Sequence, residues 1–573
     1  MNSKNQPALR TIAIALLFFL ALLAWTLWQF HFNYLIASND TFFHSQRIEE
    51  IRLAFENHSL PSWVNFNSFF NTGQAINGMY PDFTLWPFVL LTNFLTPVHQ
   101  IIAIKSLISG MTFIVTFLSL NKRFESQNAI LAATIFTLSG SALKDLTTEM
   151  QTGTAIVMIF AFPIIFTLKD AIETDKINPN LIIKTALLMT IVINSHLLSA
   201  VTITLIAGIF LIVESIVKKT YIPWINLAVA AILTVILCLP IIYRIMTISK
   251  TGLLSPFGKG HVLSDPIWTL FLNSRWLSKS AISLPALILL VITLVGIKKN
   301  KFKQLLPWLL VELALILFST NIIPWGLLDH VPIINNFQVA NWRFAPFLGM
   351  VPLIVVMINF DKKVARIILL TLAVLAYPFA LKVALTAQFH KTDNLPLVTA
   401  NTTKLVSQNT GAKLTSTGIT SDKLIRTLIP DYSPKTTPLQ KDSGGLNLDQ
   451  QVVYLLSNHI GATSTKDVPL KHTSTINSLS LTGENVPAGD ITLPVFGYKS
   501  LNYRVTINGF PADWHINKQG FITINSNKIL KKAHYTVTQI QPRTYPSIIW
   551  MSFVLYLAFI GVLITPTIKK LRE

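Results

Sequence analysis

The sequence predicts a polytopic α-helical membrane protein with about 12 spans and a β-rich domain outside the membrane near the C-terminus. Three observations carry this prediction. Of the 573 residues, 51% are hydrophobic and 13% are charged. The mean hydropathy of +0.53 lies on the membrane side of what soluble globular domains show. Apolar runs of roughly 20 residues recur along the chain, and one long polar stretch interrupts them near the C-terminus.

Each expected span is an apolar run of roughly 20 residues, although some runs are shorter or interrupted. The runs are 9–35, 98–120, 127–141, 152–168, 182–195, 197–216, 224–244, 281–297, 305–322, 344–360, 366–385 and 546–566. The first run is too long for the apolar region of a signal peptide, so we expect it to stay as a membrane anchor.

Basic residues at the ends of the spans set the expected orientation. With the N-terminus in the cytoplasm, the main clusters fall on the cytoplasmic side, as the positive-inside rule requires. They are Lys122 with Arg123, Lys218 with Lys219, Lys298 to Lys303, Lys362 with Lys363, and Lys569 with Lys570. We expect a multi-pass protein of the bacterial plasma membrane with both termini cytoplasmic. Topology then explains the net charge of +20, and the expected partner is the lipid bilayer, with no nucleic acid.

The same orientation divides the chain into three parts. Residues 1–385 form a transmembrane domain with an outer loop at 37–83. Residues 386–545 form an extracytoplasmic β-rich domain, and residues 546–573 form the final transmembrane helix and a basic cytoplasmic tail.

Local patterns in the outer domain predict strands. Tyr503, Val505 and Ile507 alternate with polar residues and precede Asn508-Gly509, a turn signal that predicts a β-hairpin. Further strands are expected at 491–496, 520–525 and 534–540.

The first outer loop carries the most informative polar motif. If residues 41–56 form a helix, Asp40 lies at its N-cap, and His44 and Arg47 share one face. One interpretation assigns these residues to a catalytic site. The alternative is that Asp40 only caps the helix and that Arg47 only pairs with Glu50 or with lipid phosphate.

Further carboxylates follow in two outer segments. Asp82 ends the first outer loop, and Asp145 and Glu149 lie in the next outer turn. Asp40 with such acids could bind a divalent cation, Mg²⁺ or Mn²⁺, and the expected ligand set is Asp40, Asp82 and Glu149. A carboxylate could instead serve as a general base toward a sugar hydroxyl. Capping or solvated loop charge is the structural alternative for each acid.

Ionisable residues inside apolar runs are candidates for function because burying them is costly. His196 separates two runs, and Lys105 and Glu312 lie within others. A structural hydrogen bond or ion pair between spans is the alternative. The single cysteine, Cys238, excludes a disulfide or a cysteine-based zinc site within one chain.

The third outer turn ends in Trp342-Arg343 at the head of a span. An arginine there suits a phosphate diester at the membrane surface, whereas the alternative is snorkelling to lipid headgroups. Neighbouring outer loops are also basic, which favours an anionic ligand outside. The basic residues are Arg244, Lys250, Lys259, Arg275 and Lys279.

Taken together, these motifs resemble a known family. They are DTFFHSQRI at 40–48, PSW at 61–63, YP at 80–81, SH at 195–196 and FQVANWRF at 337–344. The chain resembles the bacterial membrane proteins labelled 6-pyruvoyl-tetrahydropterin synthase-related and the YfhO-like proteins linked to lipoteichoic acid glycosylation, both placed with the GT-C glycosyltransferases. The region 491–535 also resembles the β-rich outer domain of YfhO-like proteins. The spacing between Gln338 and Trp342 departs from the family's Gln-Phe-Pro-Trp-Arg.

The resemblance implies a GT-C-type glycosyltransferase that moves a sugar from a polyprenyl-phosphate donor to a cell-envelope glycan acceptor, such as teichoic acid. It implies that Asp40 is the catalytic carboxylate, often assisted by a divalent cation. The residues expected to bind substrate are His44, Arg47, Tyr80, His196, Trp342 and Arg343. The competing hypotheses are a transporter or flippase of lipid-linked saccharides and a non-catalytic envelope-assembly protein. An acidic first loop and a large outer domain favour the enzyme.

Overall fold

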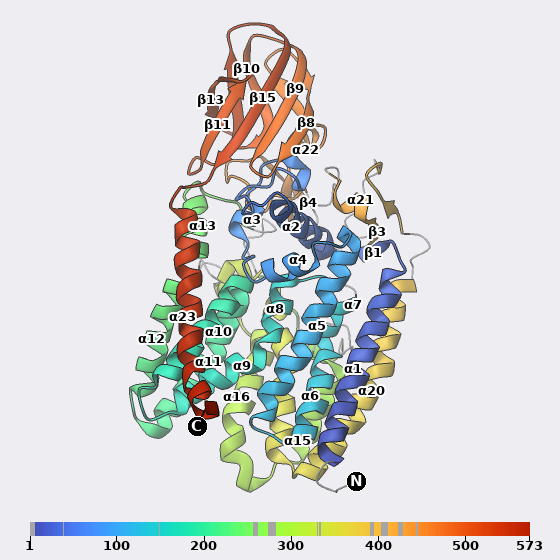
Figure 1. The fold of residues 1–573 in the computed structure, drawn as a ribbon, viewed down its shortest axis with the longest axis vertical. Coiled ribbons are helices and arrows are strands. Elements are labelled where there is room, and N and C mark those ends of the chain that lie inside the picture. Colours follow the sequence, from blue (N-terminus) through green and yellow to red (C-terminus); the bar gives the residue numbers. More distant parts are fainter. Residues whose placement is uncertain are drawn as a thin grey trace.

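The computed structural model describes residues 6–37, 39–147, 149–255, 262–272, 282–328, 331, 334–389, 395–402, 411–421, 428–442 and 445–572. A body of helices carries a β-sandwich at one end (Figure 1). The longer helices are α1 (Gln6–Phe30), α2 (Asn39–Glu56), α5 (Pro97–Asn121), α6 (Ser126–Thr137), α7 (Gly140–Thr147), α8 (Thr152–Ile159), α9 (Ala161–Glu173), α10 (Pro179–Ser195), α11 (Leu197–Lys218), α12 (Ile222–Leu237), α13 (Leu239–Ser249), α15 (Leu284–Val295), α16 (Phe302–Phe318), α19 (Val351–Asn359), α20 (Lys362–Phe389), α22 (Gln450–Ser457) and α23 (Tyr545–Arg572). The shorter helices are α3 (Ile76–Met79), α4 (Trp86–Thr92), α14 (Ile267–Leu272), α17 (Trp325–Leu328), α18 (Ala340–Phe344) and α21 (Ser416–Ile419).

Six helical segments among the described residues are long and apolar enough to cross a bilayer. They are Ala8–Phe30, Pro97–Asn121, Leu197–Lys218, Ala340–Asn359, Lys362–Thr386 and Tyr545–Thr565. The total reaches 9 if each of three bent pairs, α6 with α7, α8 with α9 and α12 with α13, counts as one span. The chain is therefore a multi-pass helical membrane protein, as predicted, whereas the count of about 12 spans is not confirmed.

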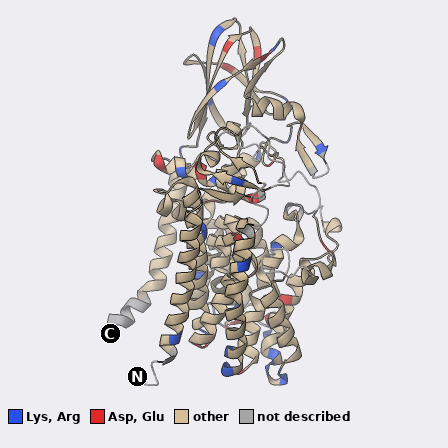
Figure 2. Cartoon of the chain, turned by 90° about the vertical axis from the view of Figure 1, so that its right-hand side faces the viewer, with Lys and Arg blue, Asp and Glu red and all other residues tan. Residues whose placement is uncertain are grey.

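The helices of the body divide into a buried core and an apolar outer layer. Helices satisfy their own backbone hydrogen bonds, which lipid cannot do. Phe162 of α9 and Ile354 of α19 are buried in the core, whereas Leu20 of α1 and Val554 of α23 stay exposed, as lipid-facing side chains do. Lys and Arg gather at the helix ends away from the sandwich (Figure 2).

The sandwich consists of two five-stranded antiparallel sheets, ordered β13-β14-β10-β6-β7 and β12-β11-β15-β9-β8. The strands are β6 (Ile460–Thr463), β7 (Asp467–Pro469), β8 (Lys471–Thr475), β9 (Ser478–Val486), β10 (Gly489–Phe496), β11 (Asn502–Ile507), β12 (Phe510–Pro511), β13 (Asp513–Ile516), β14 (Phe521–Ser526) and β15 (Leu530–Ile540). The predicted hairpin is confirmed, because β11 pairs with β12 while Asn508 and Gly509 both adopt positive φ. The strands expected at 491–496, 520–525 and 534–540 are β10, β14 and β15.

The first expected span, 9–35, is longer than the helix that forms. Helix α1 ends at Phe30, and the apolar residues after it form β1 (Tyr34–Ala37). This strand pairs with β3 (Ala412–Thr415), which also pairs with β2 (Leu397–Val398). Short apolar runs fit a helix end and a strand equally well, so only pairing with a distant segment decides the structure here.

The first outer loop packs between the helices and the sandwich. The backbone N–H of Ala75 donates to the Tyr498 hydroxyl at 2.9 Å, and that of Phe496 donates to the Thr72 carbonyl at 2.8 Å. Trp63 is fully buried, and its ring lies 4.8 Å from the ring of Tyr545 at the start of α23. The loop is therefore a structural junction between the two parts of the molecule.

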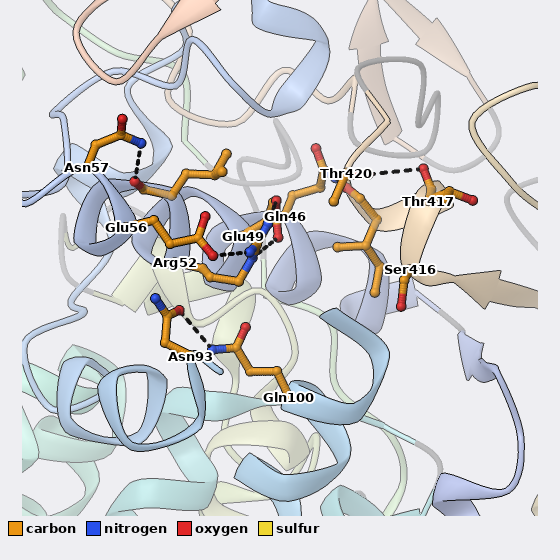
Figure 3. Close-up of polar contacts among 12 residues, drawn as sticks. Gln46, Glu49, Arg52, Glu56, Asn57, Asn93, Gln100, Ser416, Thr417 and Thr420 are labelled. Carbon is orange, nitrogen blue, oxygen red and sulfur yellow. Dashed lines mark hydrogen bonds and ion pairs between the residues drawn. The ribbon is translucent and has the colours of Figure 1, made fainter. Parts of the chain in front are cut away.

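Helix α2 is fixed in direction by contacts at both of its sides. The Gln46 amide donates to the carbonyl of Ile419 in α21, and its oxygen accepts from the backbone N–H of Phe69 at 3.0 Å. Arg52 forms ion pairs with Glu49, at 2.7 Å, and with Glu56 along the helix (Figure 3). These contacts hold the opposite face of α2, with its predicted site residues, toward the helical body.

Candidate active site

Helix α2 brings the first site residues together. It begins at Asn39, so Asp40 lies in its first turn and not at the expected N-cap, and the carboxylate still benefits from the helix dipole. His44 and Arg47 follow on one face at i and i+3, and Arg47 Nη1 lies 3.2 Å from His44 Nδ1. The expected common face of these two residues is therefore present.

Arg47 is fully buried and well packed. Its Nη2 donates to the Pro81 carbonyl at 2.9 Å, and its guanidinium lies 4.0 Å from the centre of the Tyr80 ring. A cation over an aromatic face is stabilised by the ring quadrupole. Burial lowers the pKa of Arg47, while the nearby Tyr80 and Asp82 oppose that shift. Arginine stays protonated even so, and it supplies a fixed positive charge.

Residues at the start of α8 contact Asp40 and His44. The Gln151 amide donates to Asp40 Oδ2, and the Thr152 hydroxyl lies 3.2 Å from His44 Nδ1. A Cβ on Gly153 would lie 2.6 Å from the Ser195 carbonyl oxygen and 3.2 Å from His196 Cβ. A glycine is therefore required where α8 approaches the break between α10 and α11.

His196 lies in that break and caps α11. Its Nδ1 accepts from the Ser199 backbone N–H at 3.3 Å and lies 2.7 Å from the Ser199 hydroxyl. Burial lowers the pKa of His196 to about 3, and the positive charge of Arg343 and interactions with His44 and Arg47 act in the same direction. The imidazole is therefore neutral at physiological pH and adds no third cation.

Arg343 approaches the same group from α18. Its Nε donates to the Phe337 carbonyl at 2.8 Å, and its Nη2 donates to Gln338 Oε1 at 2.6 Å. Gln338 also adopts a positive φ of 61°. Among the described residues, Nη1 of Arg343 has no hydrogen-bond partner, so one edge of the guanidinium remains available to a ligand. Trp342 is partly exposed beside it.

Five of the six predicted substrate-binding residues, all but Trp342, therefore lie within electrostatic range of one centre. Arg343 interacts electrostatically with Asp40 and Tyr80, and His196 interacts with Arg343, His44 and Arg47. One carboxylate thus lies among two arginines, two imidazoles and a phenol. Such a set can bind an anionic group and accept a proton from a neighbouring hydroxyl.

Two of the expected metal ligands have basic partners. Asp82 is buried, its Oδ1 lies 2.7 Å from Arg244 Nη2, and its Oδ2 accepts from Trp86. Glu149 lies 2.9 Å from Lys144 Nζ. No group of three or more His, Cys, Asp or Glu side chains in the described part of the chain is placed to hold a metal ion. Asp40, Asp82 and Glu149 therefore do not fit a single ligand set, and cation binding at Asp40 with other ligands stays a prediction.

Three site residues were not predicted from the sequence. Gln151 and Thr152 follow the acidic turn that was singled out for its carboxylates, and only the fold reveals their contacts. Tyr432 lies in a polar stretch without a clear period, yet it interacts electrostatically with Arg47 and Arg343. Its only local signal is the turn-forming neighbourhood of prolines and Asp431.

Part of the predicted basic outer surface cannot be placed. Lys259, Arg275 and Lys279 lie outside the described residues. Arg244 is buried against Asp82, so it serves the ion pair and not an outer surface.

Comparison with known proteins gives a distant likeness to two proteins of solved structure. No family model and no curated protein matches the chain. The chain is similar to ArnT from Cupriavidus metallidurans bound to undecaprenyl phosphate, with a TM-score of 0.41 and 12% identity over 71% of this chain and 84% of that chain. The apo state of ArnT gives a TM-score of 0.40, 13% identity and the same 71% and 84% coverage.

A second similar structure is the arabinofuranosyltransferase AftD from Mycobacteria, with a TM-score of 0.41 and 14% identity. The match covers 68% of this chain and only 27% of AftD. Likeness at this level establishes neither a family nor a residue correspondence, so a function must be argued from the site.

Proposed function

We propose that this chain is a GT-C-type glycosyltransferase that moves a sugar from a polyprenyl-phosphate donor to a cell-envelope acceptor, such as teichoic acid or another surface glycan. The observation that carries the proposal is that Asp40 lies within electrostatic range of Arg343, which stands at the head of a helical segment long enough to span the membrane. A lipid-linked phosphate reaches such a position from the bilayer, while a polar acceptor reaches it from the aqueous side.

The reaction uses one proton acceptor and fixed positive charge. Asp40 accepts the proton of an acceptor hydroxyl, whose oxygen attacks the anomeric carbon of the donor sugar. The new carbon–oxygen bond forms while the bond from that carbon to the phosphate oxygen breaks. The electron pair leaves with the polyprenyl phosphate, and the positive charges of Arg343 and Arg47 stabilise it.

The remaining predicted residues have supporting roles in this proposal. Gln151 holds the Asp40 carboxylate in place, and Tyr80 and His44 surround Arg47. Trp342 offers an aromatic face beside Arg343 for the sugar or the first isoprene units. A divalent cation bound to Asp40 would neutralise phosphate charge, and its remaining ligands would come from outside the Asp82 and Glu149 side chains.

The proposed location is the outer face of a bacterial plasma membrane, with both termini cytoplasmic. Helix α2, which carries Asp40, lies where the helical body meets the sandwich, and Lys and Arg residues gather at the opposite ends of the helices (Figures 1 and 2). The positive-inside rule then puts the site and the sandwich outside.

The test is sugar transfer by the purified full chain in proteoliposomes supplied with radiolabelled polyprenyl-phosphate sugars. Label should move from the lipid phase to an added envelope glycan, and Asp40→Asn protein should not move it. Asp513→Asn, which changes an exposed acid in the sandwich, is the matched control. Label that crosses to the other leaflet without leaving its lipid would identify a flippase and overturn the proposal.

A further inference from the structure

Tyr432 has an unusual backbone conformation for its residue type. It lies between Asp431 and Ser433 with a positive φ of 60°. A bulky L-residue is strained in this left-handed region, where glycine or asparagine is more usual. Such conformations persist where the surrounding structure fixes them, and they gather at functional sites.

Three separate parts of the chain hold this conformation. The Tyr498 hydroxyl, from the sandwich, donates to the Tyr432 carbonyl at 3.0 Å. The Tyr432 N–H donates to the Leu254 carbonyl at 3.1 Å, in the segment after α13. Gln74, from the first outer loop, donates to the Asp431 carbonyl. The position of Tyr432 is therefore fixed by the outer sandwich, the helical body and the outer loop together.

The phenol of Tyr432 lies within electrostatic range of the candidate site. The phenol interacts electrostatically with Arg47 and Arg343 and with the neighbouring Tyr80. The side chain is partly exposed, and within the described part of the chain its hydroxyl has no hydrogen-bond partner. Burial raises the pKa of Tyr432, and Tyr80 and Asp431 add to that shift, so the hydroxyl keeps its proton at neutral pH.

A protonated phenol and two guanidinium groups are all hydrogen-bond donors that suit an anionic ligand. Each donates hydrogen bonds, and a phosphate oxygen accepts several at once. Arg343 and Tyr432 are both partly exposed and come from distant parts of the sequence, so a phosphate between them would accept from both, while the buried Arg47 adds its positive charge.

We propose that the Tyr432 hydroxyl donates a hydrogen bond to the phosphate of the lipid-linked ligand, so that the segment leading into the outer sandwich completes the site. The inference rests on the proposed function for the identity of the ligand. It also assigns the outer domain a direct part in donor binding.

The experiment measures undecaprenyl phosphate binding to the full chain in detergent, by titration and by the ligand-induced rise in melting temperature. Tyr432→Phe keeps the ring and loses the hydroxyl. Removal of a hydrogen bond to a charged group should weaken the affinity about tenfold. The melting temperature without ligand should remain that of the wild type. Tyr454→Phe, which changes an exposed tyrosine of α22, is the matched control.

A second variant separates contact from packing. Tyr432→Asn accepts the left-handed backbone without strain and is too short to reach the phosphate. It should fold and bind as weakly as Tyr432→Phe or more weakly. Wild-type affinity in both variants would overturn the role of Tyr432 and leave the proposed function standing. Absence of any binding to wild-type protein would instead overturn the proposed function.

Discussion

Asp82 and Arg244 form a buried ion pair, with Arg244 Nη2 at 2.7 Å from Asp82 Oδ1, that ties the first outer loop to α13. Both side chains are almost fully shielded, with 0% and 2% of their area exposed. The pair is held further because Arg244 also donates to the Tyr80 carbonyl at 3.1 Å. Asp82 therefore positions Tyr80 beside Arg47 through a structural contact.

Asp82→Asn should destabilise the protein by about 3–5 kcal/mol, because it leaves a buried guanidinium without its counter-charge. Thermal unfolding in detergent measures the effect. The double variant Asp82→Asn with Arg244→Gln should recover part of the loss, since no unpaired charge remains. A melting temperature that Mg²⁺ or Mn²⁺ raises in the wild type and not in Asp82→Asn would instead make Asp82 a metal ligand.

The sequence predicted the elements that depend on local pattern. Apolar runs indicated a multi-pass helical body, and the alternation before Asn508-Gly509 indicated the β11–β12 hairpin. The i, i+3 spacing of His44 and Arg47 indicated their shared face. Each of these signals lies within a single segment of about 20 residues or fewer and needs no knowledge of the rest of the chain.

Contacts between distant segments could not be predicted in this way. Nothing local to Tyr34–Ala37 reveals its pairing with Ala412–Thr415, about two-thirds of the chain away. Asp82 was expected as a metal ligand because it is one of several acids in the outer segments. Its ion-pair partner Arg244 lies in another helix, so local sequence could not reveal the pair. Tyr432 carries no periodic signal, and its role emerges only from the position that Tyr498 and Leu254 give it.

Arg343→Lys should raise the apparent donor Km roughly tenfold while the fold is retained, because lysine keeps the charge and loses the planar fork. The Phe337 carbonyl and Gln338 Oε1 accept from Nε and Nη2, and among the described residues Nη1 has no hydrogen-bond partner, so Nη1 can bind the donor. Transfer rates over a range of donor concentrations give the Km. Arg366→Lys, at an ion pair with Glu125 far from the site, is the control, and an unchanged donor dependence would remove Arg343 from the donor site.

Residues 386–545 should be cut by protease added outside intact protoplasts, whereas a tag at the C-terminus should survive. The reason is the gathering of Lys and Arg at the helix ends opposite the sandwich, which the positive-inside rule puts in the cytoplasm. Immunoblots against the tag before and after permeabilisation measure the result. Loss of the tag with an intact outer domain would reverse the orientation.

Glu50 should make stability depend on pH. Burial raises the pKa of Glu50 to about 7, although hydrogen bonds from Ser68 and Asn67 oppose the shift. The folded state therefore holds a proton that the unfolded state releases near its ordinary pKa of about 4.3. The contribution of this proton to the free energy of unfolding is therefore complete below about pH 4.3. It is lost as the pH rises through the folded-state pKa of about 7. The melting temperature of Glu50→Gln, measured between pH 5 and 8, should not show this part of the decline. Identical pH profiles of the variant and the wild type would contradict the prediction.

Asp40→Asn should reduce sugar transfer by roughly a hundredfold or more, because the amide cannot accept the acceptor proton. Its folding cost should be small, since asparagine has nearly the same shape and can still bond with the helix start and with the Gln151 side chain. Gln151→Ala offers a graded comparison: it keeps the carboxylate and removes its support, so transfer should fall by less. The test of this role measures initial transfer rates with saturating donor. It uses variants whose melting temperature equals that of the wild type. Near wild-type transfer by Asp40→Asn would make Asp40 a structural residue of the first turn and direct the search for the base to Asp145 or Glu149.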